Sequence, residues 1–259
     1  MTYYGFVAFN SEPLQLCGDM LRQGFDLGMS IGTTSIAFLS MIQHMKTMII
    51  SGEKLSVLLG KVDYYWGLAT THQNVFAKTY LSIFRETISI LIDKGATTSS
   101  QIHSNSNAVQ SQNISEAIFF HKAIQAYWQG HNERCHHYVG KISKMRVDNG
   151  KLSSMIITFI HGINTFQMLK RQNTAKLRSI PNAAISTLKT ATAYSRWNFR
   201  NKVHLLEAEN FSFHNNHEEA KASYAAAITS ARCSRFIHEQ ALGKQNLWLD
   251  SDSETKFYM

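Results

Sequence analysis

Helix breakers are almost absent from this sequence, and apolar residues recur along it at the spacing of an α-helix. Proline removes a backbone donor and clashes inside a helix, and it occurs only twice in 259 residues, at Pro13 and Pro181. Apolar residues lie three or four positions apart, as in Leu21, Phe25 and Met29, so that they share one helical face. No stretch of comparable length alternates as strands joined by hairpin turns would. The sequence therefore predicts an all-α fold.

The periodic segments predict a long series of helices with one polar interruption. Residues 95–112 are rich in Ser, Asn and Gln, which predicts a polar surface loop or linker. This loop separates an N-terminal helical repeat segment (1–94) from a C-terminal helical segment (113–249), and a polar tail (250–259) follows. The predicted helices cover residues 13–31, 33–50, 53–71, 75–92, 115–129, 132–145, 151–169, 181–194, 197–213, 217–233 and 236–249.

A short pattern recurs at three of the predicted turns. Each turn carries a glutamate, and the helix that follows has apolar residues spaced four and then three positions apart. These spacings place the side chains on one helical face, where we expect them to pack against the paired helix. The last occurrence, Ala-x3-Tyr-x2-Ala, is typical of the second helix of a tetratricopeptide unit, so the pattern predicts antiparallel helix pairs stacked in a right-handed, tetratricopeptide-like superhelix. The predicted repeat-packing positions are Leu55, Leu59, Val62, Cys135, Val139, Ile142, Ala220, Tyr224 and Ala227.

Four longer segments carry a family resemblance. Residues 198–209 read NFRNKVHLLEAE, 220–228 read AKASYAAAI, 236–242 read FIHEQAL and 80–91 read YLSIFRETISIL. Together they resemble the tetratricopeptide-like helical region of large signalling proteins. In those proteins the region lies between an AAA-type ATPase domain, often preceded by a kinase-like domain, and GAF plus histidine-kinase domains. The resemblance spans nearly the whole chain and implies a helical spacer or docking platform between catalytic modules.

The sequence also departs from that family. Residues 243–259 lose the small-residue pattern and turn acidic and polar, and the ATPase, GAF and kinase modules are absent from these 259 residues. Two explanations stay open: the gene retains only the helical part, or the sequence is a fragment of a longer reading frame.

No group of residues in the sequence predicts catalysis. The Gly-Lys pairs at Gly60, Gly140 and Gly243 lack both the opening glycine and the Ser or Thr of a phosphate-binding loop. Kinase signatures are absent as well. Glu207 and Glu209 lie two apart on a predicted helix and point in different directions, so we expect Glu207 to support a neighbouring helix or a basic side chain. We predict that the chain is not an enzyme and holds no cofactor.

The densest set of soft metal ligands comprises His131, Cys135, His136 and His137. His131 and Cys135 share a helical face at a spacing of four, which metal sites use. Cys135 is also one of the repeat-packing positions, however, and the other two histidines then point elsewhere. We therefore predict structural or surface roles for this cluster and no metal site.

Positive charge is concentrated between residues 141 and 202. The net charge of the chain is +8, and this span holds twelve Lys and Arg but a single acid, Asp148. A face this basic would attract nucleic acid, acidic lipid or an acidic protein segment. Trp197, between two arginines, is the one tryptophan placed beside basic residues as base stacking requires. The candidate anion-binding residues are Lys141, Lys144, Arg146, Lys170, Arg171, Arg196 and Arg200.

Cysteine usage and hydropathy indicate the compartment. Cys17, Cys135 and Cys233 are far apart and odd in number, which favours a reducing, cytoplasmic environment over a disulfide framework. No signal-peptide pattern is visible, and the most apolar stretch, 29–50, is interrupted by polar residues, so we expect no membrane span.

Two hypotheses about function follow from these features. The first is a non-catalytic helical scaffold that mediates protein–protein or interdomain contacts in signal transduction, with a protein or an adjoining signalling domain as its partner. The alternative is an electrostatic binder of nucleic acid or other polyanions through the basic 141–202 face.

Overall fold

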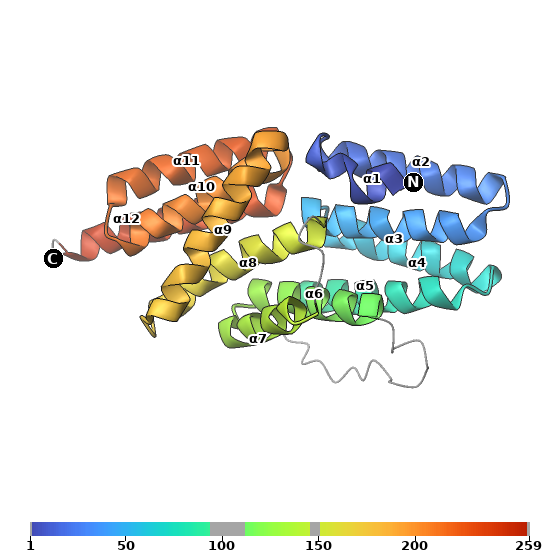
Figure 1. Ribbon diagram of the computed structural model, residues 1–259, viewed down its shortest axis with the longest axis horizontal. Coiled ribbons are helices and arrows are strands. Elements are labelled where there is room, and N and C mark those ends of the chain that lie inside the picture. The colour runs from blue at the N-terminus through green and yellow to red at the C-terminus, as the bar shows by residue number, and fades with distance from the viewer. Residues whose placement is uncertain (1, 94–111, 146–150, 258–259) are drawn as a thin grey trace. The chain divides into compact units, whose positions relative to one another are not determined.

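The computed structural model describes residues 2–93, 112–145 and 151–257, and Figure 1 shows that these residues form helices joined by turns. No strand occurs among them, so the predicted all-α fold is confirmed. The predicted loop 95–112 lies outside the described residues, except for Gln112, which begins a helix. Besides one 3₁₀ turn, η1 (Ala8–Asn10), the helices are α1 (Thr2–Phe6), α2 (Leu14–Ser30), α3 (Thr34–Ser51), α4 (Leu55–Thr71), α5 (Val75–Ile92), α6 (Gln112–Trp128), α7 (Asn132–Ser143), α8 (Leu152–Leu169), α9 (Ala175–Tyr194), α10 (Arg196–Phe213), α11 (His217–Cys233) and α12 (Ile237–Phe257).

The start of α9 corrects the predicted boundary, because the helix begins at Ala175 and not at Pro181. Thr174 caps the first turn, where its hydroxyl accepts a hydrogen bond from the N–H of Leu177 at 3.4 Å. Pro181 therefore lies inside the helix, where it contributes no backbone donor. Pro181 is buried four residues after Leu177 and seven before Leu188, which are buried as well. Burial of this apolar face offsets the missing hydrogen bond, which the sequence pattern alone does not reveal.

The same turn geometry follows six helices of the described chain. In each turn one residue adopts a left-handed backbone, with its N–H donating to the carbonyl three residues back. The next N–H donates to the carbonyl five residues before it, which completes a Schellman motif and satisfies the last carbonyls of the helix. Each of these turns leads directly into the next helix, so consecutive helices form hairpins. The left-handed residues are Gly32, Gly52, Gln73, Gly130, Asn215 and Arg235.

The chain divides into two compact units. Unit 1 contains Met1–Ala8 and Gln15–Ile157, and unit 2 contains Phe9–Leu14 and Thr158–Met259. In unit 1, α4 packs on α5, α5 on α6, and α6 on α7. In unit 2, α9 packs on α10, α10 on α11, and α11 on α12. Sequence neighbours are therefore the main packing partners in both units, as in a series of helix hairpins.

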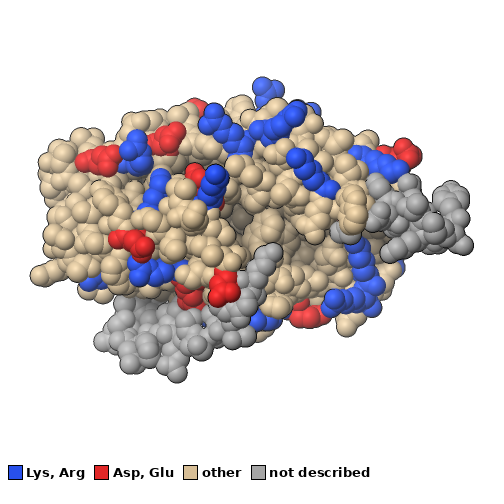
Figure 2. Space-filling view, turned by 180° about the vertical axis from the view of Figure 1, so that it is seen from behind, with Lys and Arg blue, Asp and Glu red and all other residues tan. Residues whose placement is uncertain are grey.

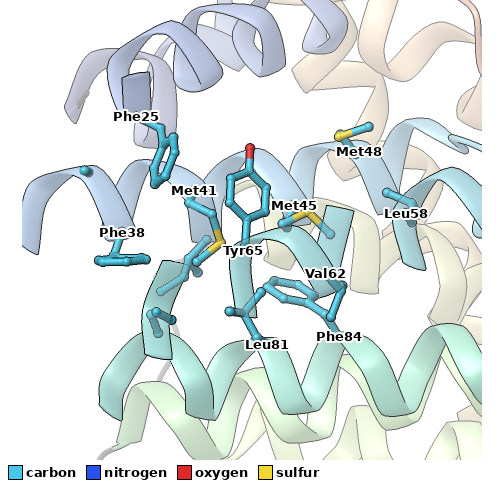
Figure 3. Close-up of a cluster of buried hydrophobic side chains, with 14 of the residues drawn as sticks. Phe25, Phe38, Met41, Met45, Met48, Leu58, Val62, Tyr65, Leu81 and Phe84 are labelled. Carbon is cyan, nitrogen blue, oxygen red and sulfur yellow. The ribbon is translucent and has the colours of Figure 1, made fainter. Parts of the chain in front are cut away.

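The core of unit 1 is a cluster of aromatic, methionine and aliphatic side chains contributed by α2, α3, α4 and α5 (Figure 3). Phe25 from α2 packs edge-on against Phe38 and Tyr65, with ring centroids 6.0 and 5.1 Å apart. Met41 and Met45 on α3 are fully buried within this cluster. Full burial of each such side chain contributes about 1.5–3 kcal/mol to stability, so this cluster is a main source of stability in unit 1.

The core of unit 2 depends on small residues that let helices approach closely. A Cβ atom added to Gly162 on α8 would lie 2.7 Å from Leu206 Cδ2 and 2.9 Å from Ala184 Cβ. Ala220 and Ala227 on α11 are also buried and leave room for the neighbouring helices. Glycine and alanine therefore determine how close α8, α9 and α10 lie, because proteins pack without spare volume.

Candidate functional site

Seven of the nine predicted repeat-packing residues are buried. Leu55 and Leu59 are the two that are half-buried, and they lie at the edge of the unit 1 core. Leu58 and Tyr65, which the repeat pattern does not include, are buried on α4 together with Val62. In α4 the buried face is therefore rotated slightly from the one that the repeat pattern indicates, because the pattern allows more than one helical register.

The predicted anion-binding residues are spread over both units. Lys141 and Lys144 belong to unit 1, whereas the members from residue 170 onward belong to unit 2, and Arg146 lies outside the described residues. On the face shown in Figure 2, Lys and Arg side chains form several separate groups with uncharged and acidic residues between them. The described members that are exposed are Lys141, Lys144, Lys170, Arg171, Arg196 and Arg200.

Several charges counted in the basic span have acidic partners from elsewhere in the chain. Lys189 Nζ lies 2.7 Å from Glu207 Oε1, and Lys151 Nζ lies 3.6 Å from Glu116 Oε2. Lys202 is fully buried, with no exposed side-chain surface, so it does not contribute to any basic face. The linear charge count thus overstates the positive charge that is available at the surface.

Lys202 is instead the centre of a buried polar cluster in unit 2. Its ammonium group donates to Glu239 and to the carbonyl of Asn198, at 3.0 and 3.1 Å. It also lies 3.8 Å from the centre of the Phe236 ring, a cation–π geometry. Asn201 donates a further hydrogen bond to Glu239. Burial lowers the pKa of Lys202, whereas the carboxylate of Glu239 acts to raise it.

Asn198 on α10 forms hydrogen bonds with the segment Phe9–Leu14. Its Nδ2 donates to the carbonyls of Phe9 and Glu12, both at 2.8 Å, and its Oδ1 accepts from the N–H of Leu14 at 2.9 Å. Ser195 donates to the same Phe9 carbonyl at 2.7 Å. These bonds join residues about 185 positions apart in the sequence. Asn198, the first residue of the NFRNKVHLLEAE segment, therefore has a structural role. We call this set of hydrogen bonds the clamp formed by Asn198.

The two glutamates of the same segment have separate partners. Glu207 contacts Lys189, a basic side chain of the kind predicted for it. Glu209 is buried and accepts hydrogen bonds from Tyr224 Oη at 2.7 Å and Asn246 Nδ2 at 2.6 Å. The pair therefore does not present two carboxylates to one substrate, and Glu209 instead joins α10 to α11 and α12.

The histidine and cysteine cluster on α7 does not converge. Cys135 is buried, and burial raises the pKa of its thiol to about 12, which disfavours the thiolate that metals bind. His131 and His137 are exposed. Across residues 2–93, 112–145 and 151–257, no three His, Cys, Asp or Glu side chains are arranged to hold a metal ion.

Trp197 is half-buried and its indole Nε1 is buried without a hydrogen-bond partner in the described chain. The guanidinium of Arg196 lies 5.9 Å from the centre of its ring. Trp197 thus already has a cationic neighbour at cation–π distance.

A small polar pocket lies in unit 1 where α5, α6 and α7 meet. It has a volume of about 130 Å³. Sequence reasoning missed it because its residues come from three helices and form no known motif. The only sequence signal is a polar face at helical spacing on α6 and α7. The α5–α7 pocket is lined by Glu86, Lys122, Gln125, Ala126, Gln129, Arg134 and Tyr138.

A buried hydrogen-bond chain holds one wall of this pocket in place. Gln125 Nε2 donates to Thr87 Oγ1 at 3.0 Å, and Thr87 uses its only proton on the carbonyl of Ile83 at 2.8 Å. The contact of 3.1 Å between Thr87 Oγ1 and His121 Nδ1 therefore requires His121 to be the donor. Burial, helped by the nearby charge of Lys46, lowers the pKa of His121 to about 3, so the ring is neutral.

Comparison of the chain with protein-family models, curated proteins and solved structures gives no match. Among the described helices, none combines the length and the apolar character that crossing a bilayer demands.

Proposed function

We propose that this chain is a non-catalytic helical scaffold that mediates protein–protein or interdomain contacts in signal transduction. The observation that carries the proposal is the repetition of helix hairpins closed by one turn geometry. The left-handed turn residues Gly32 and Gln73 enclose a helix pair with an interval of 41 positions. That interval is longer than the ~34 residues of a tetratricopeptide unit and lies within the ~40–47 of other helix-pair repeats. Stacked helix pairs of this kind commonly serve as extended binding surfaces.

Exposed apolar side chains at one end of unit 1 support a contact function. The α2–α3 and α4–α5 turns lie at the same end (Figure 1), and Phe38 and His72, beside these turns, are in ring contact at 6.1 Å. Ile31 and Val75 are 65% and 66% exposed there. Exposed apolar side chains at adjacent turns are available for contact with a partner protein.

Affinity capture with the full chain tests the scaffold proposal. We expect the double variant Ile31→Lys/Val75→Asp to lose a partner that the unchanged chain retains, because charge at these positions opposes apolar contact. The control variant Ser56→Lys/Ser89→Asp adds the same charges at exposed polar positions and should retain the partner. Equal capture by all three chains, with circular dichroism showing equal helix content, would count against this surface. ATP turnover by the purified chain would contradict the non-catalytic assignment.

The polyanion alternative has a separate test. Binding of heparin or RNA should weaken steeply as salt rises, because each neutralised phosphate releases counterions. Binding that is absent, or that stays constant from low to high salt, would remove this alternative.

A further inference from the structure

We propose that the α5–α7 pocket binds a carboxylate group of a protein partner. This inference rests on the proposed scaffold function and adds the chemistry of the partner. The pocket brings two cations, Lys122 from α6 and Arg134 from α7, to one small polar hollow. Neither cation forms an ion pair with another residue of the described chain, and the Lys122 ammonium lies 5.9 Å from the centre of the Tyr138 ring. Both therefore have donors available for an incoming anion.

The size of the pocket limits what can enter it. Sites that enclose a whole cofactor or drug-sized ligand usually have volumes of about 300–1,000 Å³. A volume of about 130 Å³ holds one small functional group. The rest of the molecule that carries this group must therefore remain outside, as it does when the end or a side chain of a partner protein inserts.

The charge of the pocket favours a carboxylate over a phosphate. Glu86 lines the same pocket as Lys122 and Arg134, so the three formal charges leave a net charge of +1. A carboxylate carries one negative charge and would leave the pocket neutral, whereas a phosphate carries nearly two at neutral pH and would leave uncompensated negative charge there, at a higher cost of desolvation. Arginine also presents parallel N–H donors that match the two oxygens of a carboxylate.

The neutral residues of the pocket orient the carboxylate that enters it. Gln125 is buried and anchored through Thr87, so it does not need to be ordered when a ligand enters. Gln129 and Tyr138 add polar atoms from α6 and α7. Because α6 and α7 are joined by a Schellman turn at Gly130, the two cationic helices are held at a fixed spacing.

Nuclear magnetic resonance titration of the full chain tests this inference with defined probes. N-acetylglycine represents a chain terminus, the N-methylamide of N-acetylaspartate represents an acidic side chain, and N-acetylglycinamide is the neutral control. Inorganic phosphate is titrated at matched ionic strength. We expect saturable amide shifts in residues 122–138 with one or both carboxylates. The tighter carboxylate identifies a terminus or a side chain as the natural ligand group.

The variant Lys122→Gln/Arg134→Gln should bind the carboxylate at least about tenfold more weakly, because charge-assisted hydrogen bonds are lost. The charge-matched control Lys54→Gln/Lys78→Gln alters two cations of unit 1 that do not line the pocket, and it should bind as the unchanged chain does. The inference is overturned if neither carboxylate gives saturable shifts, if phosphate binds more tightly than both, or if the pocket variant binds normally. Since no partner protein is present, this titration can fail while the capture experiment succeeds.

Discussion

Lys202 Nζ lies 2.8 Å from Oε1 of Glu239, and both side chains are almost completely shielded from solvent. The two residues belong to α10 and α12 and are 37 positions apart in the sequence. A buried ion pair of this kind contributes little net stability as a pair, because both charges lose their hydration. Removal of one partner is different, since it leaves the other charge buried and uncompensated.

Glu239→Ala should therefore lower the free energy of unfolding by about 3–5 kcal/mol. The double variant Lys202→Met/Glu239→Leu removes both charges and should be clearly less destabilised than Glu239→Ala alone. Urea unfolding followed by circular dichroism measures both. A loss below about 1 kcal/mol in Glu239→Ala would mean that Lys202 is solvated or neutral in the folded chain.

Acid should destabilise the fold through buried neutral histidines. His121 has a pKa of about 3 in the folded chain because of burial, against 6.5 for an unperturbed histidine. Between pH 6.5 and pH 3, His121 is protonated in the unfolded chain but neutral in the folded chain. The contribution of neutral His121 to the free energy of unfolding is therefore fully present above pH 6.5 and is lost as the pH falls. At pH 4 the loss from His121 is about 3 kcal/mol. His44, whose pKa is lowered to about 4 mainly by burial, acts in the same direction.

His121→Asn keeps a donor near the Nδ1 position for Thr87 and removes the titration. Over this pH window the variant should take up about one proton less on unfolding than the unchanged chain does. The slope of its free energy of unfolding against pH should be smaller by the corresponding amount. His137→Asn makes the same substitution at an exposed histidine and is the matched control. Identical slopes for His121→Asn and the unchanged chain would show that His121 titrates normally.

Substitution of two glycines by alanine should have opposite effects on stability. Gly162→Ala places a Cβ against Leu206 and Ala184 and should lower the free energy of unfolding by about 1–3 kcal/mol through overpacking. Gly140→Ala meets nothing within 4 Å and should stabilise α7 by up to about 1 kcal/mol. Thermal unfolding of both variants distinguishes the signs. A neutral Gly162→Ala would indicate that α8 can move away from α9 and α10.

The cysteines should react at very different rates. Cys233 is exposed, whereas Cys17 and Cys135 are buried. A thiol reagent at pH 8 should modify one thiol quickly in the folded chain and the other two only after unfolding. Cys233→Ser should abolish the fast phase, and rapid modification of a second thiol would show that a helix opens locally.

The sequence pattern predicts the helices well because turn residues and apolar spacing act locally. Gly52 and Gly130, for example, are recognisable as helix ends, and α5 has the predicted bounds. The predicted start of α9 at Pro181 was wrong, because tertiary burial compensates for a residue that usually ends or begins a helix.

The polar contacts were less predictable. Lys202 counted as a surface charge because its partner, Glu239, comes from a helix that no local pattern links to it. The α5–α7 pocket was missed for the same reason, since Glu86 and Arg134 become neighbours only when α5, α6 and α7 pack. Sequence spacing reveals contacts within one helix, whereas these features depend on contacts between helices.

The clamp formed by Asn198 has a consequence for synthesis of the chain. Residues 9–14 leave the ribosome well before Asn198 on α10, which follows Leu14 by 184 positions. Unit 2 therefore combines the early segment Phe9–Leu14 with helices that are synthesised much later. Until then the carbonyls of Phe9 and Glu12 must be hydrated or held by a chaperone. Removal of residues 9–14 should for this reason disturb α10 and not only the neighbouring residues in the sequence.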